Sequence, residues 1–100
     1  MADVYWLTFR IHHDADYEHR YNRLVDLIQS LTTKWWAEPT AFIVFRCDLD
    51  IDTLAGRVKA KIDPSKDLAL VGMPDYKSAR LIGASSDKDI FELMPFVKKV

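Results

Sequence analysis

The chain has 100 residues, of which 49% are hydrophobic and 29% are charged, and its formal net charge is −1 at pH 7. This length and composition are typical of a soluble globular protein and predict a single domain spanning residues 1–100. A nearly neutral chain is not expected to attract nucleic acid over its whole surface. The longest apolar run is far shorter than the ~20 residues of a membrane-spanning helix, so no membrane partner is expected.

Two features of the sequence favour a cytoplasmic location. The first ten residues have no basic segment followed by a leucine-rich core, so no secretion signal is expected. Cys47 is the single cysteine and cannot form an internal disulfide. It follows an apolar run, and we expect it to be buried as a small apolar group in a reducing compartment.

The first predicted elements are a strand and a helix. Residues 3–12 place apolar side chains at every second position, which is typical of a strand with a buried face. Asp14 or Asp16 is expected to cap a helix of about four turns, because apolar residues then recur every three or four positions up to Thr32. Arg20 is expected on the outer face of this helix.

Residues 34–37 and 40–47 predict two further strands. Pro39 separates them because it cannot donate a ladder hydrogen bond, and we expect the two strands to form a hairpin. The second strand is apolar at every position from 41 to 45. A strand of this kind needs cover on both of its faces.

The next predicted elements are a second helix and a fourth strand. Asp48 or Asp50 is expected to cap the helix, and Asp63 with the following proline is expected to end it. Residues 67–73 form a short apolar run between turn residues, which indicates a strand buried on both faces.

The last part of the chain predicts one more strand and a short helix. Residues 79–84 are expected to form the strand. Ser86 and Asp89 have the spacing of a capping box, which would open a short helix that Pro95 kinks or stops. Residues 98–100 are expected to fray at the C-terminus.

The order of these elements predicts an α+β fold. It is the ferredoxin-like βαββαβ arrangement with an antiparallel sheet, an extra C-terminal strand and a short C-terminal helix. Right-handed crossovers would place both long helices on one face of the sheet, so that the bare face holds Trp6, Thr8, Phe42, Val44 and one of Trp35 and Trp36. Because monomers rarely expose so large an apolar patch, we expect a second copy of the chain to cover it in a homodimer.

Several of these residues resemble a known family. The turn 16–18, the pair Trp35-Trp36 and the apolar strand 40–45 are similar to the SinR-like branch of the small CRISPR-associated adaptation nucleases. This is the second Cas protein family, to which the VapD interferases are related, and the resemblance covers roughly residues 3–84. It implies a ferredoxin-like homodimer joined through the sheets.

The resemblance also implies details of the interface and of the active site. The last strand, residues 79–84, would add to the sheet of the other subunit, which brings Leu81 and Ile82 into the expected dimer interface. The family's proposed catalytic aspartate ends the first strand and holds Mg²⁺ with its symmetry mate. That position is Arg10 in this chain, and an arginine cannot bind a divalent cation.

Three functions follow as alternatives. The first is a non-catalytic nucleic-acid-associated or assembly protein that binds RNA or DNA through basic residues, namely Arg10, Arg46, Arg57, Lys59, Lys61 and Arg80. The second is a metal-dependent endoribonuclease that uses Asp14 or Asp16, with His13 beside them, and Mg²⁺. The third is an interaction subunit of the toxin–antitoxin type that binds a second protein and no nucleic acid. No cofactor is expected except the Mg²⁺ of the second alternative.

Overall fold

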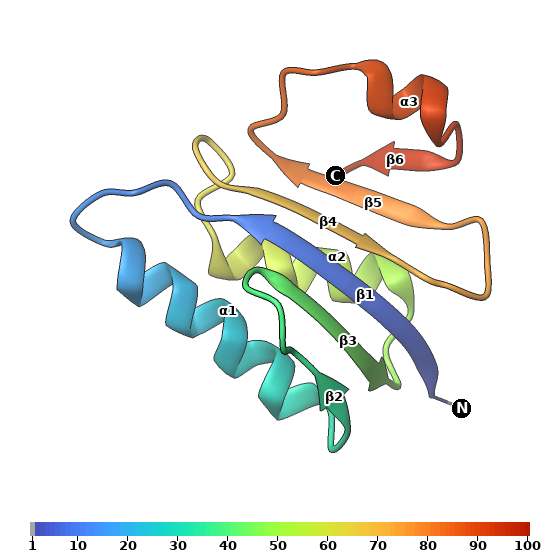
Figure 1. The fold of residues 1–100 in the computed structure, drawn as a ribbon, viewed down its shortest axis with the longest axis horizontal. Helices are drawn as coiled ribbons and strands as arrows, with labels where there is room; N and C mark the ends of the chain where they lie inside the picture. Colours follow the sequence, from blue (N-terminus) through green and yellow to red (C-terminus); the bar gives the residue numbers. More distant parts are fainter. Residues whose placement is uncertain (1) are drawn as a thin grey trace.

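A six-stranded sheet forms the centre of the computed structural model, which describes residues 2–100 (Figure 1). Along the chain the elements are β1 (Asp3–Arg10), α1 (Tyr17–Leu31), β2 (Trp35–Trp36), β3 (Phe42–Cys47), α2 (Ile51–Lys61), β4 (Leu68–Gly72), β5 (Ala79–Gly83), α3 (Asp89–Leu93) and β6 (Val97–Lys99). The α+β class, the extra C-terminal strand and the short C-terminal helix are confirmed. Among the described residues, no helix combines the length and the apolar character needed to cross a bilayer.

The strands lie in the order β2-β3-β1-β4-β5-β6 across the sheet. All neighbouring pairs are antiparallel except β5 and β6, which are parallel. The prediction of a purely antiparallel sheet is therefore wrong at this edge. Residues 98–100 were expected to fray, but Lys98 and Lys99 instead belong to β6, which follows α3 and extends the sheet.

Helices α1 and α2 cover the same face of the sheet. Tyr5 and Leu7 of β1 are fully buried in one core with Leu24 of α1 and Leu54 of α2. Cys47 is buried in this core as a free thiol, as expected. The apolar residues of each helix recur every three or four positions and form one face. This face packs against every second residue of the strands.

Local side-chain hydrogen bonds explain where two of the helices begin. The carboxylate of Asp50 accepts a hydrogen bond of 2.7 Å from the backbone N–H of Thr53, which caps α2 as predicted. The predicted capping box at Ser86 is wrong, because α3 begins only at Asp89. There the carboxylate of Asp87 accepts from the Asp89 N–H at 2.9 Å.

The C-terminal segment lies on the other face of the sheet and covers one end of it. A second apolar cluster joins Leu81 of β5 to Val97 of β6, and Ile90 of α3 packs against this cluster. Strand β5 has β4 on one side and β6 on the other, so both of its edges are paired within its own chain. The expectation that residues 79–84 complete the sheet of another subunit is corrected by this pairing.

Candidate interaction face

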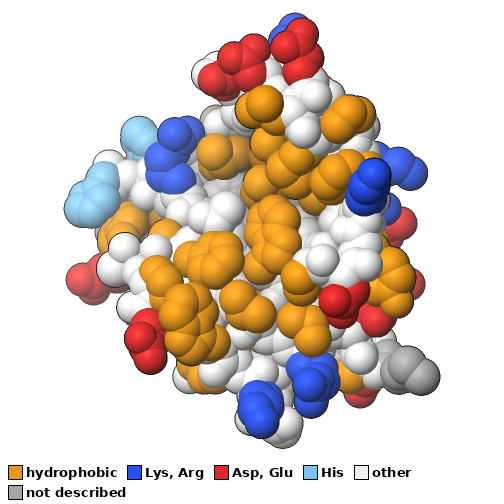
Figure 2. Space-filling model, turned by 45° about the vertical axis from the view of Figure 1, so that its right-hand side comes forward, with side chains coloured by type: hydrophobic (Ala, Val, Ile, Leu, Met, Phe, Trp, Pro, Cys, Tyr) orange, Lys and Arg blue, Asp and Glu red, His pale blue; other side chains and the backbone are white. Residues whose placement is uncertain are grey.

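The part of the helix-free face that α3 leaves uncovered is called the open face below. Its residues are Trp6, Thr8, Phe42, Val44 and Leu70, which are partly exposed, and Trp36, which is exposed. Trp6 lies opposite Val44, and Thr8 lies opposite Phe42, in the antiparallel register of β1 and β3. Figure 2 shows apolar side chains gathered in one field over this side of the molecule.

Trp6 lies flat on the sheet at the centre of the open face. A methyl group placed on Gly72 of the neighbouring strand would come within 2.3 Å of the Trp6 ring. The indole therefore occupies the space that a side chain at position 72 would fill, which keeps this part of the face level. A level apolar surface favours packing against another surface of the same kind.

Trp36, not Trp35, belongs to the open face. Trp36 pairs with Val44 across β2 and β3, its ring packs edge-on against Phe42 at a centroid distance of 6.3 Å, and it is 46% exposed. Trp35 points the other way and lines a hollow beside Tyr21 of α1. The hairpin thus places one indole on each side of the sheet.

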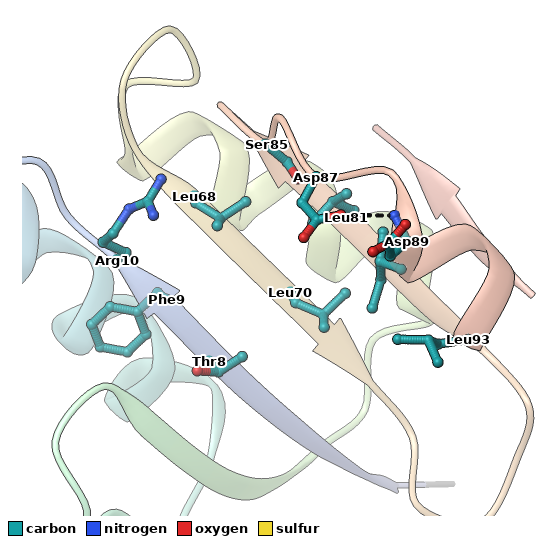
Figure 3. A pocket seen from close by; sticks show the side chains of 11 residues that line it. Thr8, Phe9, Arg10, Leu68, Leu70, Leu81, Ser85, Asp87, Asp89 and Leu93 are labelled. Carbon is teal, nitrogen blue, oxygen red and sulfur yellow. Dashed lines mark hydrogen bonds between the residues drawn. The ribbon is translucent and has the colours of Figure 1, made fainter. Parts of the chain in front are cut away.

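A groove of about 400 Å³ runs between the open face and α3 (Figure 3). Leu70 and Leu81 form part of its floor, and Leu93 of α3, which is 78% exposed, stands at its side. Arg10 lies at one end of the groove, and Asp87 and Asp89 are on the opposite rim. The groove joins the apolar open face to a rim of charged groups.

Two of the residues predicted for the dimer interface do not lie on the open face. Ile82 is fully buried on the side of the helices, and Leu81 is covered by the chain's own C-terminal segment. The other four predicted residues, Trp6, Thr8, Phe42 and Val44, do lie together. The correction follows from the pairing of β5 within its own sheet.

The six basic residues predicted for nucleic-acid binding do not form one surface. Arg10 and Arg46 are exposed at the groove and at the end of β3, while Arg57, Lys59 and Lys61 lie on α2 beyond the other face of the sheet. Because α2 covers the opposite face, these two groups of cations cannot contact one backbone together.

Arg80 is not available to a ligand. It is only 8% exposed, and its Nε donates a hydrogen bond of 2.6 Å to the carboxylate of Asp52 on α2. The ion pair with Arg80 holds the pKa of Asp52 below its usual range. The prediction of Arg80 as a nucleic-acid contact is corrected by this burial.

Asp14, one of the acids predicted for the nuclease alternative, forms ion pairs with cations of its own chain. Nζ of Lys66 lies 2.6 Å from one carboxylate oxygen of Asp14, and Nη1 of Arg20 lies 3.1 Å from the other. His13 is exposed and packs on the ring of Tyr17, and Asp16 directs its backbone N–H at Asp14. Within residues 2–100, no three His, Cys, Asp or Glu side chains are grouped so that they could hold a metal ion.

A buried carboxylate that sequence reasoning missed organises this end of the domain. Asp67 is fully buried and accepts hydrogen bonds of 2.8 Å each from Arg20 Nε and from the backbone N–H groups of His12 and Asp63. Arg20 is only 5% exposed, so its predicted place on the outer face of α1 is wrong. The hydrogen bonds of Asp67 join the end of β1, helix α1 and the turn before β4. The role of this network is therefore structural.

This network predicts that the protein loses stability in acid. Lys66 and Arg20 hold the pKa of Asp14 well below its usual value, so the folded state binds a proton at Asp14 less readily than the unfolded state. The stabilisation is fully present above the unfolded pKa of ~3.9 and is lost as the pH falls below it toward the folded pKa.

Urea unfolding measured at several pH values below about 5 checks this expectation. The slope of unfolding free energy against pH is expected to be shallower in Asp14→Asn than in the wild type. Lys66→Met is expected to reduce the slope in the same direction, because it removes the closest cation. Equal slopes in the wild type and Asp14→Asn would contradict the assignment.

Comparison of the chain with protein-family models, curated proteins and solved structures gives no match. A function is therefore proposed from the structure of the open face and of the charged residues at its ends.

Proposed function

We propose that the chain is a non-catalytic assembly protein whose open face pairs with a second copy of the same chain. The observation that carries this proposal is the apolar surface of Trp6, Phe42 and Val44, which none of the helices α1, α2 and α3 covers. Exposed apolar patches of several hundred Å² usually mark an interaction site. A patch that is complementary to itself produces a two-fold dimer.

The energetics of pairing support this proposal. A standard interface buries about 800 Å² on each partner, and apolar burial contributes ~25 cal/mol per Å². The gross gain from an apolar interface of that size is tens of kcal/mol, against an association cost of ~4 to 15 kcal/mol. The flat indole of Trp6 and the exposed indole of Trp36 supply the large aromatic contacts that interfaces favour.

The same architecture supports a proposed relationship to the SinR-like branch of the adaptation nucleases. The order β2-β3-β1-β4 and the packing of both long helices on one face support the proposed ferredoxin-like core. Two features set this chain apart from the implied family pattern. Arg10 stands where the metal-binding aspartate is expected, and β5 is paired within its own sheet.

The distribution of charge favours assembly over the other two alternatives. Arg57 and Lys59 lie on α2, away from Arg10 and Arg46 at the open face, so these predicted cations do not form one continuous surface for a phosphate backbone. Asp14 is engaged by Lys66 and Arg20 and would have to give up both cations to bind Mg²⁺.

The oligomeric state tests the proposed function directly. We expect the wild-type protein to sediment as a dimer at micromolar concentration. Val44→Glu places a charge on the pairing surface beside Trp6 and is expected to weaken the dimer by about 100-fold or more. Lys59→Glu on the exposed side of α2 is the matched control and is expected to leave the dimer intact.

Analytical ultracentrifugation over a concentration series, with circular dichroism to verify folding, gives the result. A wild-type protein that remains a single subunit at tens of micromolar would overturn the proposed function, because the apolar face would then be stable in water.

A further inference from the structure

From the charges and shape of the open face, and resting on the proposed function, we infer how the two copies are oriented. Each copy places the acidic ridge formed by α3 in the basic hollow at the other end of its partner's open face. The acidic ridge carries Asp87, Asp89 and Glu92. The basic hollow carries Lys34 and Arg46.

The acidic ridge stands at one end of the open face. Helix α3 packs over β5 on the helix-free side, and Leu93 projects from it with 78% of its surface exposed. Asp87 and Asp89 lie on the side of the ridge that lines the groove (Figure 3). Glu92 is exposed on α3. None of the three acids forms an ion pair with another of residues 2–100.

The basic hollow lies at the opposite end. It is a depression of about 360 Å³ whose walls include Trp36 and Val44, with the side chains of Lys34 and Arg46 at its border. Both cations are exposed and are also free of ion pairs within the described part of the chain. Figure 2 shows acidic side chains above the apolar field and basic side chains below it, with further basic side chains at its upper left and at its right.

The separation of the two ends selects one of the ways in which two such faces can meet. Face-to-face packing needs a two-fold axis in the plane of the contact. An axis perpendicular to the line between the ends, horizontal in Figure 2, puts each ridge opposite the partner's hollow. An axis along that line would put ridge against ridge and acid against acid, which combines a steric collision with charge repulsion.

In the selected orientation the apolar contacts also complement one another. Leu93 is the most exposed large apolar side chain in the described chain. In this orientation it packs into the hollow beside Trp36 of the partner subunit. The level region around Trp6, between the β2 edge and the α3 edge of the sheet, lies between the two ridges. The occupant of the open face is therefore a second copy of the chain, bound in a closed and symmetric way.

Charge reversal at each end separately tests this orientation. One variant, K34E/R46E, makes the hollow acidic, and the other, D89K/E92K, makes the ridge basic. Asp87 is left in place because its carboxylate accepts a hydrogen bond from the Asp89 N–H at the start of α3. In the proposed orientation each variant alone brings like charges together twice, and we expect its dimer to dissociate at least about 30-fold more readily than the wild type at low salt.

An equimolar mixture of the two variants is expected to form a mixed dimer within a few-fold of wild-type affinity. In the mixture every ridge again meets a hollow of opposite charge. The quadruple variant K34E/R46E/D89K/E92K is expected to pair with itself for the same reason. Sedimentation at two salt concentrations, with one variant carrying a fluorescent label, measures both results, and the rescue itself shows that the variants are folded.

The outcomes separate the orientation from the proposed function. If the wild type is a dimer and both double variants pair as tightly as it does, or if mixing restores nothing, the orientation is wrong while the proposed function stands. If the wild type is a single subunit under the same conditions, both the orientation and the proposed function are overturned. If each double variant dimerises more weakly than the wild type and the mixture regains the wild-type affinity, the orientation is supported.

Discussion

Replacing Asp67 with alanine is expected to lower the free energy of unfolding by about 3 to 5 kcal/mol, the usual cost of removing one partner of a buried ion pair. Asp67 is fully buried, and its two carboxylate oxygens accept hydrogen bonds from Arg20 and from two backbone N–H groups. Without the carboxylate, the guanidinium of Arg20 stays buried near its former partner, and both N–H groups lose their acceptor. Urea unfolding at neutral pH measures the difference.

A matched pair of variants separates the buried carboxylate from the exposed one. Asp14→Asn removes the other acid that contacts Arg20, but Asp14 lies at the surface, where water and Lys66 remain available, so a smaller loss is expected. The double variant Asp67→Ala/Arg20→Met is expected to be more stable than the sum of the single changes predicts, since no unpaired charge is then buried. A loss below about 1 kcal/mol in Asp67→Ala would contradict this account.

Gly83→Ala is expected to destabilise the protein by at least about 2 kcal/mol. Gly83 ends β5 with a φ of +96°, a conformation that residues with a Cβ rarely adopt. An added Cβ would also lie 2.0 Å from the backbone oxygen of Asp67, which already accepts a hydrogen bond from the Ala84 N–H. Backbone atoms must move to relieve this overlap, and they belong to the residue that organises the buried network.

Gly56→Ala is the control for this change. Gly56 lies within α2, and a Cβ there meets nothing within 4 Å. Alanine at such a position is expected to stabilise the helix by up to about 1 kcal/mol. Thermal unfolding of the two variants should therefore shift in opposite directions, by roughly 4 to 8 °C for each kcal/mol in a domain of this size. A Gly83→Ala protein as stable as the wild type would show that this backbone contact is not needed.

The local pattern of the sequence was sufficient to predict most elements of the fold. Alternation in β1 and the three-and-four spacing in α1 and α2 each arise from one element packing on one core, so they can be seen without knowing the partner. The parallel pairing of β5 with β6 could not be predicted in this way. It depends on how residues 84–96 turn back over the sheet, and no periodicity records that path.

The charged residues show where sequence reasoning fails. Arg20 and Arg80 were assigned to the surface because cations usually are exposed, but each is buried against an acid that is distant in the sequence. An acid at the very start of an apolar strand, as at Asp67, was the available hint of a buried pair. Trp6, Phe42 and Val44 were placed correctly on one side of the sheet because strand alternation alone puts them there.

The two outermost strands limit how copies of this chain can join. Strand β2 has two residues and β6 has three, and β6 carries Lys98 and Lys99. Short edges and edge lysines are poor templates for the addition of a further strand, which is how open-ended fibres grow. The architecture therefore disfavours unlimited polymerisation along the sheet. Copies of the chain would instead join through the open face, which is fully occupied once two molecules have paired.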